Sequence, residues 1–436
     1  MKQGALTILT PIDPAHVDEL EVLLAQLGAN IATQTLIPFD QLDLLHFTSW
    51  VIIRSDKFGP QLVFESNFDG GPQEFLDQLA GRARTALDEI YRFCPGYPPA
   101  GDNRAIAGYL LRSAVYTDTF YVGGVGLTRQ RIDQEKRLRA KVETFLDNLP
   151  SGLSAMETRR RIQDFVRADP ELQWALHGAE TPSLWDRIVF WAPVAIAAAV
   201  LALVIVFVFH HHSWTGLAVM LAVPIVLLLA AYAVLRRHEI SDPSISDEPG
   251  DLAVQAPPAH VRNLVQQEDR RPQNHLASIT LVKPGPFRFT LLKTVLAAIN
   301  IGARYIFNKG QLGGIPSIHF ARWAMINHGE QLLFLSNFDG SWEHYLGEFI
   351  DQAAGGLTAV WSNAVNFPRT TRLIQGGAAD EQKFKAYARR SQIPAQLWYS
   401  AYPFLSVPNI LDNAAIRQSL WGDLSDSELE VWLRRF

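Results

Sequence analysis

Two long apolar stretches in the middle of the chain constrain its fold more than any other feature. Residues 188–209 (IVFWAPVAIAAAVLALVIVFVF) and residues 214–235 (WTGLAVMLAVPIVLLLAAYAVL) contain no charged side chain. As α-helices, each would be about 33 Å long at about 1.5 Å per residue, enough to cross a hydrocarbon core of about 30 Å. Pro193 and Pro224 do not exclude this, because neighbouring helices can satisfy the carbonyls that a proline frees. Both stretches are therefore predicted to span a membrane.

The short connection between these stretches predicts a tight transmembrane helical hairpin over residues 186–237. Only His210–Ser213 separates the spans, while Arg187 precedes the first span and Arg236 and Arg237 follow the second. By the positive-inside rule, both termini are expected in the cytoplasm and the turn outside, in a two-span protein of the inner cell membrane. The consecutive histidines of the turn are expected to be solvated, because neighbouring residues converge poorly on one metal ion. No metal site is predicted.

The composition supports a membrane protein and excludes other classes. Of the 436 residues, 48% are hydrophobic and only 19% are charged, against about 25% charged in a typical soluble protein. The net charge of −5 is too small to favour a nucleic-acid partner. One cysteine, Cys94, cannot form an intrachain disulfide, which agrees with a cytoplasmic location. The bilayer is the partner that the sequence predicts, and the oligomeric state stays open.

The segments on either side of the hairpin resemble each other. Residues 61–70 (QLVFESNFDG) and 331–340 (QLLFLSNFDG) are identical at eight of ten positions. Two further matches occur in the same order: HFTSW (46–50) with HFARW (319–323), and EFLDQLA (74–80) with EFIDQAA (348–354). Three ordered matches predict an internal duplication.

Each copy is expected to fold as βαββαβ. The first strands are expected at residues 5–12 and 277–284, and the late strands at residues 115–124 and 397–407. This order is typical of a ferredoxin-like α+β module, an antiparallel sheet with helices on one face. Because the open face of each sheet must be buried, the two tandem modules are expected to pack together as an intrachain barrel.

The predicted domain boundaries follow from this pattern and from composition. A Pro-rich, acidic linker follows the hairpin. The segment 125–185 is charged and helical, and it is expected to extend the first module. The expected units are module 1 (1–150, with its helical extension to about 185), the hairpin (186–237), the linker (238–274) and module 2 (275–436).

The repeated HFxxW motif offers one histidine per copy. In a strand, the period of two places His46 with Trp50, and His319 with Trp323, on one face. If this face lines the space between the sheets, each imidazole points into an apolar cavity and suits a haem ligand or a general base. The alternative is a core histidine that is hydrogen-bonded to a backbone carbonyl.

The repeated SNFDG motif offers Asn67 and Asp69 in the first copy, and Asn337 and Asp339 in the second. These are turn-forming residues, yet the aspartates could also face the histidines as acid–base groups. Arg322 occurs only in the second copy. It could orient peroxide or a carboxylate, or pair with an acid at the surface. If only one copy is active, this asymmetry favours the second.

Taken together, these residues resemble the dimeric α+β barrel superfamily. The stretch from residue 273 to about 420, which includes GGIPSIHFARW and LLFLSNFDGSW, is similar to a group of poorly characterised bacterial proteins. Within the superfamily, dye-decolorising peroxidases bind haem through a histidine and act on peroxide with an aspartate of a GxxDG loop and a later arginine. Here Asp69 and Asp339 each precede a glycine, but the leading glycine of that loop is absent.

The sequence leaves open whether the chain is an enzyme, and two functions follow. The first is a haem-dependent, peroxidase-like oxidoreductase for an apolar or amphipathic substrate. Its site would comprise the catalytic residues His319, Arg322, Asp339 and Asn337, the haem-pocket residues His319 and Trp323, and a secondary copy at His46, Asn67 and Asp69. The alternative is a non-catalytic, membrane-tethered module that binds a small apolar ligand or serves as a scaffold.

Overall fold

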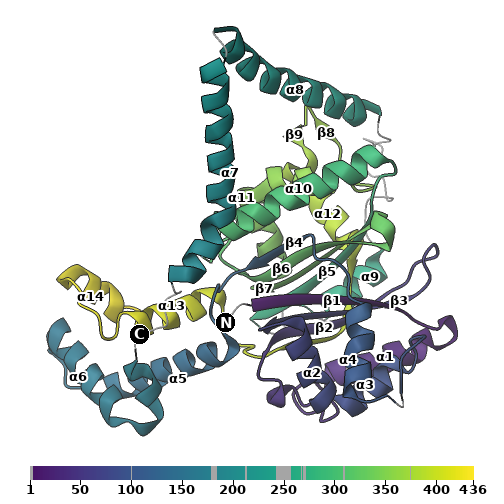
Figure 1. Cartoon of the computed structure of the whole chain (residues 1–436). Helices are drawn as coiled ribbons and strands as arrows, with labels where there is room; N and C mark the ends of the chain where they lie inside the picture. The colour runs from purple at the N-terminus through teal and green to yellow at the C-terminus, as the bar shows by residue number, and fades with distance from the viewer. Residues whose placement is uncertain are drawn as a thin grey trace.

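The computed structural model describes residues 3–99, 101–177, 184–211, 214–241, 257–266, 268, 272–307, 310–373 and 375–436. It is a mixed α/β structure with antiparallel sheets, as the sequence predicts (Figure 1). The first sheet has the order β1-β3-β2-β11, with β1 (Gln3–Pro11), β2 (Leu45–Ile53), β3 (Gln61–Asp69) and β11 (Ala395–Ser400). The second has the order β10-β5-β7-β6-β4, with β4 (Thr119–Val122), β5 (Gln273–Leu281), β6 (Ile318–Ile326), β7 (Gln331–Asp339) and β10 (Gln392–Ile393).

The two halves of the chain exchange their late strands. In the first half, Ile8 of β1 bridges Ala114, and the chain then crosses to pair as β4 with β6 of the second sheet. In the second half, β10 pairs with β5, and β11 then pairs with β2 of the first sheet. The two sheets are therefore linked at both seams, and their inner faces bury a common interior.

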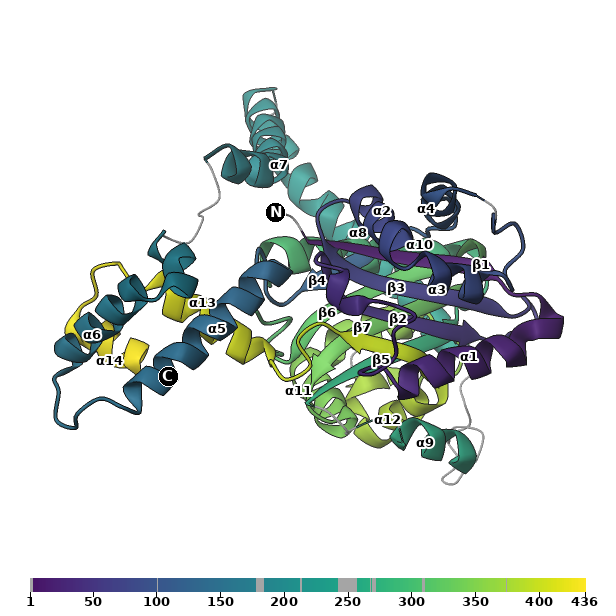
Figure 2. The ribbon, with the colours of Figure 1, turned by 90° about the horizontal axis from the view of Figure 1, so that it is seen from below.

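Helices cover the outer face of each sheet (Figures 1 and 2). The first sheet packs against α1 (Val17–Ala29), α2 (Pro72–Arg82), α3 (Arg84–Tyr91) and α4 (Asn103–Arg112). The second packs against α10 (Pro286–Tyr305), α11 (Trp342–Trp361) and α12 (Glu381–Ser391). Short elements join these: η1 (Pro14–His16), η2 (Phe39–Gln41), η4 (Asn327–Gly329), β8 (Thr370–Thr371), β9 (Gln375–Gly376), η5 (Gly377–Ala379) and α9 (Pro258–Val265).

Local sequence explains where these helices begin. Pro72 occupies the first position of α2 after the extended Gly71, where its missing N–H costs no hydrogen bond. At the matching place, Ser341 caps α11 by accepting a hydrogen bond from the His344 N–H at 3.2 Å. Asp13 similarly accepts a hydrogen bond from the Ala15 N–H at 3.0 Å. Asp13–Pro14, Gly71–Pro72 and Ser341–Trp342 thus each mark the start of a helical segment.

A separate helical lobe joins both halves of the chain. It contains α5 (Arg129–Leu146), α6 (Ala155–Ala168), η3 (Pro170–Leu176), α13 (Val407–Gln418) and α14 (Asp426–Leu433). These elements share one apolar core that includes Leu138, Ile162, Ile416 and Trp432 (Figure 2). The segment after β4, which the sequence assigns to the first module alone, thus packs with the last helices of the chain.

Two long helices leave this body. The helix α7 (Leu184–His211) contains one run, Arg187–Val206, that is long and apolar enough to cross a membrane and is not buried in the protein. The helix α8 (Trp214–Ser241) runs away from the top of α7 rather than alongside it (Figure 1). Among the described residues, one candidate span is therefore present. The second span, the packed hairpin and the orientation stay predictions, and part of the expected turn falls outside the described residues.

Candidate functional site

A β-bulge interrupts each HFxxW motif. The pairing of β2 with β3 shifts register between Leu45 and Phe47. The pairing of β6 with β7 shifts in the same way between Ile318 and Phe320. A bulge adds one residue to a strand, so the alternation of faces changes at that point. Both the histidine and the following phenylalanine of each motif consequently contact the interior between the sheets.

The two tryptophans of the motifs lie on the other side of their sheets. Trp50 packs on Phe64, with ring centroids 4.4 Å apart, in the core beneath the first set of helices. Trp323 packs on Phe334 at 4.6 Å and on Trp361 at 5.9 Å in the core beneath the second set. The prediction that each histidine shares a face with its tryptophan is therefore wrong. It assumed an unbroken strand.

Each histidine meets the aspartate of its own half. The His319 Nε2 lies 2.8 Å from the Asp339 Oδ1, and the His46 Nε2 lies 3.1 Å from the Asp69 Oδ1. The His46 Nδ1 also lies 2.9 Å from the Tyr402 hydroxyl. Of the two interpretations of the SNFDG motif, the geometry matches the one that places an aspartate beside a histidine, because both aspartates end a strand rather than forming the turn.

The second oxygen of each aspartate binds the start of a helix. The Asp69 Oδ2 accepts a hydrogen bond from the Arg129 N–H at 2.7 Å, at the first residue of α5. The Asp339 Oδ2 accepts one from the Val407 N–H at 2.7 Å, at the first residue of α13. A carboxylate is favourable at a helix N-terminus because the free N–H groups and the helix dipole attract negative charge. Each aspartate thus connects a histidine to the helical lobe.

Aromatic rings fill this end of the interior. The Phe47 ring lies 5.1 Å from His319, and the Phe320 ring lies 5.4 Å from His46, measured between centroids. The Tyr402 ring lies 5.8 Å from His46 and 6.0 Å from His319. All five side chains are buried. The imidazoles therefore face other rings rather than an open apolar cavity.

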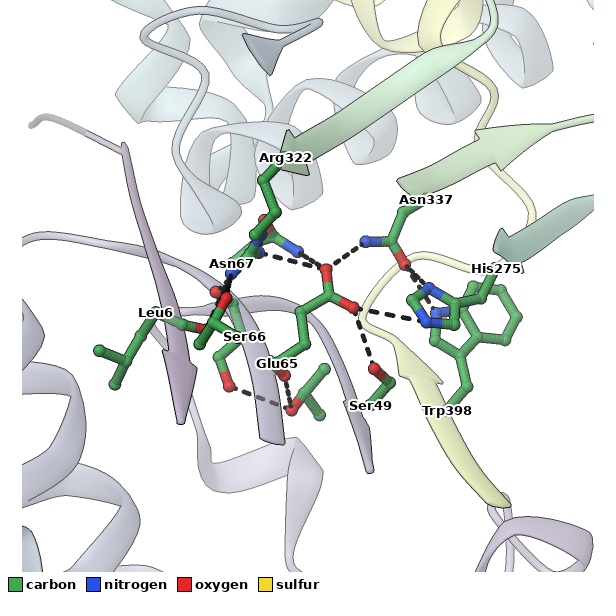
Figure 3. A network of polar contacts seen from close by, with 11 residues as sticks. Leu6, Ser49, Glu65, Ser66, Asn67, His275, Arg322, Asn337 and Trp398 are labelled. Carbon is green, nitrogen blue, oxygen red and sulfur yellow. Dashed lines mark hydrogen bonds and ion pairs between the residues drawn. The ribbon is translucent and has the colours of Figure 1, made fainter. Parts of the chain in front are cut away.

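A polar network lies deeper between the sheets, around Glu65 (Figure 3). Its Oε1 accepts hydrogen bonds from Arg322 at 3.1 Å, from Asn67 at 3.1 Å and from Asn337 at 3.0 Å. Its Oε2 accepts one from the Ser49 hydroxyl at 2.9 Å. Glu65 and Arg322 are each only 1% exposed. A buried charge of this kind needs a partner and several hydrogen bonds, and Glu65 has both.

Arg322 lies on β6 of the second sheet. In this network, all of its hydrogen bonds are to residues of the first sheet. Its Nη1 donates to the Leu6 carbonyl at 2.8 Å and to the Thr7 hydroxyl at 3.2 Å. Its Nη2 donates to the Ser66 carbonyl at 3.0 Å and to the Asn67 side chain. The structure therefore brings Arg322 to Glu65 and Asn67, and its hydrogen bonds hold the two sheets together.

His275 completes the network at its edge. The Trp398 indole N–H, which can only donate, bonds to the Asn337 Oδ1 at 2.8 Å and thereby fixes the orientation of that amide. The His275 Nδ1 lies 3.2 Å from the same oxygen, so this nitrogen carries the proton. The His275 Nε2 lies 3.5 Å from the Glu65 Oε2 without forming a hydrogen bond. Protonation of Nε2 would supply the donor that this contact lacks.

The charges of the network shift one another's pKa. Burial alone would raise the pKa of the Glu65 carboxyl, but Arg322 and then His275 outweigh burial and hold it below its usual value. Burial lowers the pKa of His275, although Glu65 opposes this effect. Burial also lowers the pKa of Arg322, again against Glu65. The favoured state is a carboxylate paired with Arg322 beside a neutral imidazole.

A groove reaches the network from the surface, at the seam where β10 and β11 pass between the sheets. Its volume is about 440 Å³, within the range of about 300–1,000 Å³ typical of ligand pockets. His275 and Trp398 line it, together with the carboxylates of Glu21 and Glu268. Six amide side chains also line it: Asn263, Gln266, Gln273, Asn274, Gln392 and Gln396. None of the described residues that line the groove is a lysine or an arginine.

Sequence reasoning missed Glu65, His275 and Trp398. The repeat carried a usable signal, because Glu65 aligns with Leu335 inside the matched motif. The strand registers also match, since Gln3 pairs with Asp69 as Gln273 pairs with Asp339, which places His275 opposite Asn337. Residues of the network are therefore found at positions where one half has a charged side chain and the matching position of the other half has an uncharged one.

Comparisons with known proteins give no assignment. No family model, no curated protein and no solved structure matches this chain. Within the part of the chain that the structure describes, no group of three His, Cys, Asp or Glu side chains could hold a metal ion. The histidine run at residues 210–212 is only partly described. The site must therefore be interpreted from its own chemistry.

Proposed function

We propose that this protein is a membrane-tethered module that binds a small polar ligand in the seam groove. The observation that carries the proposal is the groove itself, which is lined by amides and carboxylates and reaches the His275 and Trp398 side chains. Both side chains are connected through Asn337 to the buried Glu65 carboxylate. A ligand bound in the groove would therefore contact side chains that are hydrogen-bonded to the polar network between the two sheets.

The proposal includes the architecture expected from sequence: a duplicated ferredoxin-like unit folded as an intrachain α+β barrel in the inner membrane. Matching registers, matching bulges and reciprocal strand exchange support a duplication. The aspartate–helix contacts recur in both halves with the same 2.7 Å distance. In this interpretation, the exchanged strands close the barrel that two separate subunits would otherwise form.

The geometry favours the binding function over the haem-dependent peroxidase. A haem ligand needs an imidazole nitrogen that faces space for the porphyrin, but the histidines contact aspartates, Tyr402 and phenylalanine rings. His46 and His319 therefore do not fit haem in this arrangement. Arg322 and Asp339, which would act on peroxide, are engaged by Glu65 and by the Val407 N–H. The peroxidase function stays a prediction that a spectrum can test.

The lining of the groove indicates the chemistry of its ligand. Amides offer both donors and acceptors, whereas the two carboxylates are already paired, Glu21 with Arg54 and Glu268 with Arg389. Trp398 adds an aromatic surface, against which the face of a sugar or an ammonium group packs favourably. A neutral polyhydroxylated small molecule therefore fits this groove better than the apolar ligand expected from sequence.

The test compares two tryptophan substitutions on α1. Ala25 lines the groove, so Ala25→Trp should fill it, whereas Val22 is exposed and does not line it. The full chain in detergent is screened by thermal shift against a neutral disaccharide, an amino sugar and an aliphatic diamine. We expect binding that Ala25→Trp abolishes and Val22→Trp preserves. A ligand that binds both variants equally well occupies another place.

The same preparation tests the peroxidase alternative. Protein expressed with a haem supply should show no Soret absorption band, and His319→Ala should leave its spectrum unchanged. A Soret band close to one haem per chain, lost in His319→Ala, would overturn the proposal and restore the first prediction.

A further inference from the structure

The helix α10 has an outer face without charged side chains. The charged residue within this stretch, Lys293, is partly buried and pairs with Asp118. The exposed residues of the stretch are uncharged, and they are Phe289, Thr290, Thr294, Ala297, Ala298 and Ile301. The exposed apolar surface continues past the end of the helix at Ile306 and Phe307. These eight residues are called the α10 face below.

Other helices that cover the sheets expose charged side chains. The helix α12 exposes Glu381 and Lys383, and α2 exposes Glu74 and Arg82. A helix on the surface of a soluble body normally has its charged residues on the side that contacts water. Single exposed apolar side chains are common, but a continuous apolar patch marks a surface that contacts something other than water. The α10 face has the second character.

Both ends of α10 contact the two long helices that leave the body (Figure 1). At the end of α10, the Tyr305 ring lies 5.0 Å from Phe190 and 5.6 Å from Trp191, measured between centroids, and both partners belong to the candidate span of α7. At the start of α10, Phe287 stacks on His238 of α8, with centroids 4.1 Å apart. His238 lies just after the predicted second span. The α10 face therefore lies between the two points where the chain would enter and leave a bilayer.

Aromatic side chains gather where α10 meets α7. Trp185 and Trp191 of α7 are exposed, and Phe307 is exposed just after α10. Tyr305 contacts Trp191 between them. Trp and Tyr are enriched where a membrane meets water, because each has an apolar ring and a polar group that can stay hydrated. The start of α7 and the end of α10 therefore have the composition of one membrane boundary.

We propose that the α10 face lies flat on the lipid bilayer, in the leaflet that α7 enters. A helix in this position buries its apolar side about 5–10 Å into the boundary between headgroups and acyl chains. The contact would fix the orientation of both sheets relative to the membrane. It rests on the membrane tether of the proposed function and not on the ligand, because the described lining of the seam groove contains no residue of α10. The contacts with α7 favour the bilayer over a second copy of the chain as the occupant of this face.

The experiment measures the surroundings of spin labels on single introduced cysteines, in the full chain reconstituted into bilayers of phosphatidylcholine and phosphatidylglycerol. Ala298→Cys and Ile301→Cys place labels on the α10 face, whereas the control Val22→Cys places one on an exposed residue of α1, which covers the other sheet. The native Cys94 is buried. Oxygen concentrates in lipid and a chelated nickel reagent stays in water. We expect the ratio of oxygen to nickel collisions to be several-fold higher at both α10 labels than at Val22.

A charge added to the face tests whether its apolar character holds α10 on the lipid. Ile301→Asp should lower the oxygen-to-nickel ratio of the Ala298 label, because a carboxylate is costly to bury in lipid. The matched control Val22→Asp should leave that ratio unchanged. Labels on the α10 face with the same ratio as Val22 would overturn the proposal. Protection from both reagents, together with dipolar broadening between chains, would overturn it in favour of a second copy of the chain.

A label at Val200 distinguishes failure of this proposal from failure of the membrane tether. Val200 is exposed and lies near the middle of the predicted first span. A high oxygen-to-nickel ratio at Val200 with a low ratio on the α10 face would overturn the proposal and leave the tether intact. Low ratios at both places would overturn the tether as well.

Discussion

Arg322 and Glu65 belong to opposite sheets and meet between them, with the Arg322 Nη2 3.1 Å from the Glu65 Oε1. In the repeated motifs, the position that matches Arg322 holds Ser49, and the position that matches Glu65 holds Leu335. The ion pair is therefore made once, across the interface of two otherwise similar halves. Such an arrangement specifies which residues face each other, because any slip in register would leave two charges buried without partners.

We predict that Arg322→Met destabilises the protein strongly. The substitution leaves the Glu65 carboxylate buried without its cation, and loss of one member of a buried pair costs about 3–5 kcal/mol. Glu65→Leu should be costly for the same reason. The double variant Glu65→Leu/Arg322→Met should lose less than the sum of the single variants, because it buries neither charge. Urea unfolding of all four proteins measures this coupling, and strictly additive losses would contradict it.

The lowered pKa values of Glu65 and His275 predict acid sensitivity in two separate windows. Because the folded Glu65 has a lower pKa, the stability of its ion pair is complete above the ordinary value of 4.5 and is lost as pH falls through the folded value. Because the folded His275 also has a lower pKa, stability begins to fall as pH drops below its ordinary value of 6.5, where the unfolded chain gains a proton that the folded chain does not.

The unfolding temperature measured against pH separates the two windows. His275→Asn should remove the loss that begins near pH 6.5, while Glu65→Gln should flatten the loss below pH 4.5. The surface variant His16→Asn should keep the wild-type profile. A His275→Asn protein with an unchanged profile would show that this imidazole does not titrate on unfolding.

Much of the sheet architecture could be predicted from sequence. The strand around QLVFES and its repeat appears as β3 and β7, and the first strands appear as β1 and β5. Strand exchange could not be predicted, because an alternating pattern specifies which face of a strand is buried and not which sheet the strand joins. The late strands at 115–124 and 397–407 correspond to β4 and β11, and both lie in the sheet of the other half.

The candidate site was predicted only in part. His46 pairs with Asp69, and His319 with Asp339, because neighbouring strands of the same sheet bring them together. The partners of Arg322 could not be deduced, since they lie in the other sheet. The strand period alone places Trp323 on the wrong face, because a bulge leaves no simple sequence signal.

Asp69 and Asp339 are predicted to stabilise the helical lobe equally. Replacing either by alanine removes a partly buried acceptor from the first N–H of α5 or α13, at a cost of about 1–3 kcal/mol. Asp69→Asn and Asp339→Asn keep an acceptor oxygen and should cost less. Hydrogen exchange should increase at residues 129–131 in Asp69→Ala and at residues 407–409 in Asp339→Ala. An increase spread over the whole chain would instead indicate general unfolding.

The membrane orientation can be tested with single introduced cysteines, because the native Cys94 should not react with the labelling reagent. Cys94 is buried, and burial raises the pKa of its thiol to about 11, so it should not react with a maleimide. Met156, which is 54% exposed, lies in the segment predicted to be cytoplasmic. In intact cells, a membrane-impermeant maleimide should label Ser213→Cys and should label Met156→Cys only after lysis. The reverse pattern would invert the predicted orientation, and protection of both cysteines until lysis would contradict the predicted external turn between the two spans.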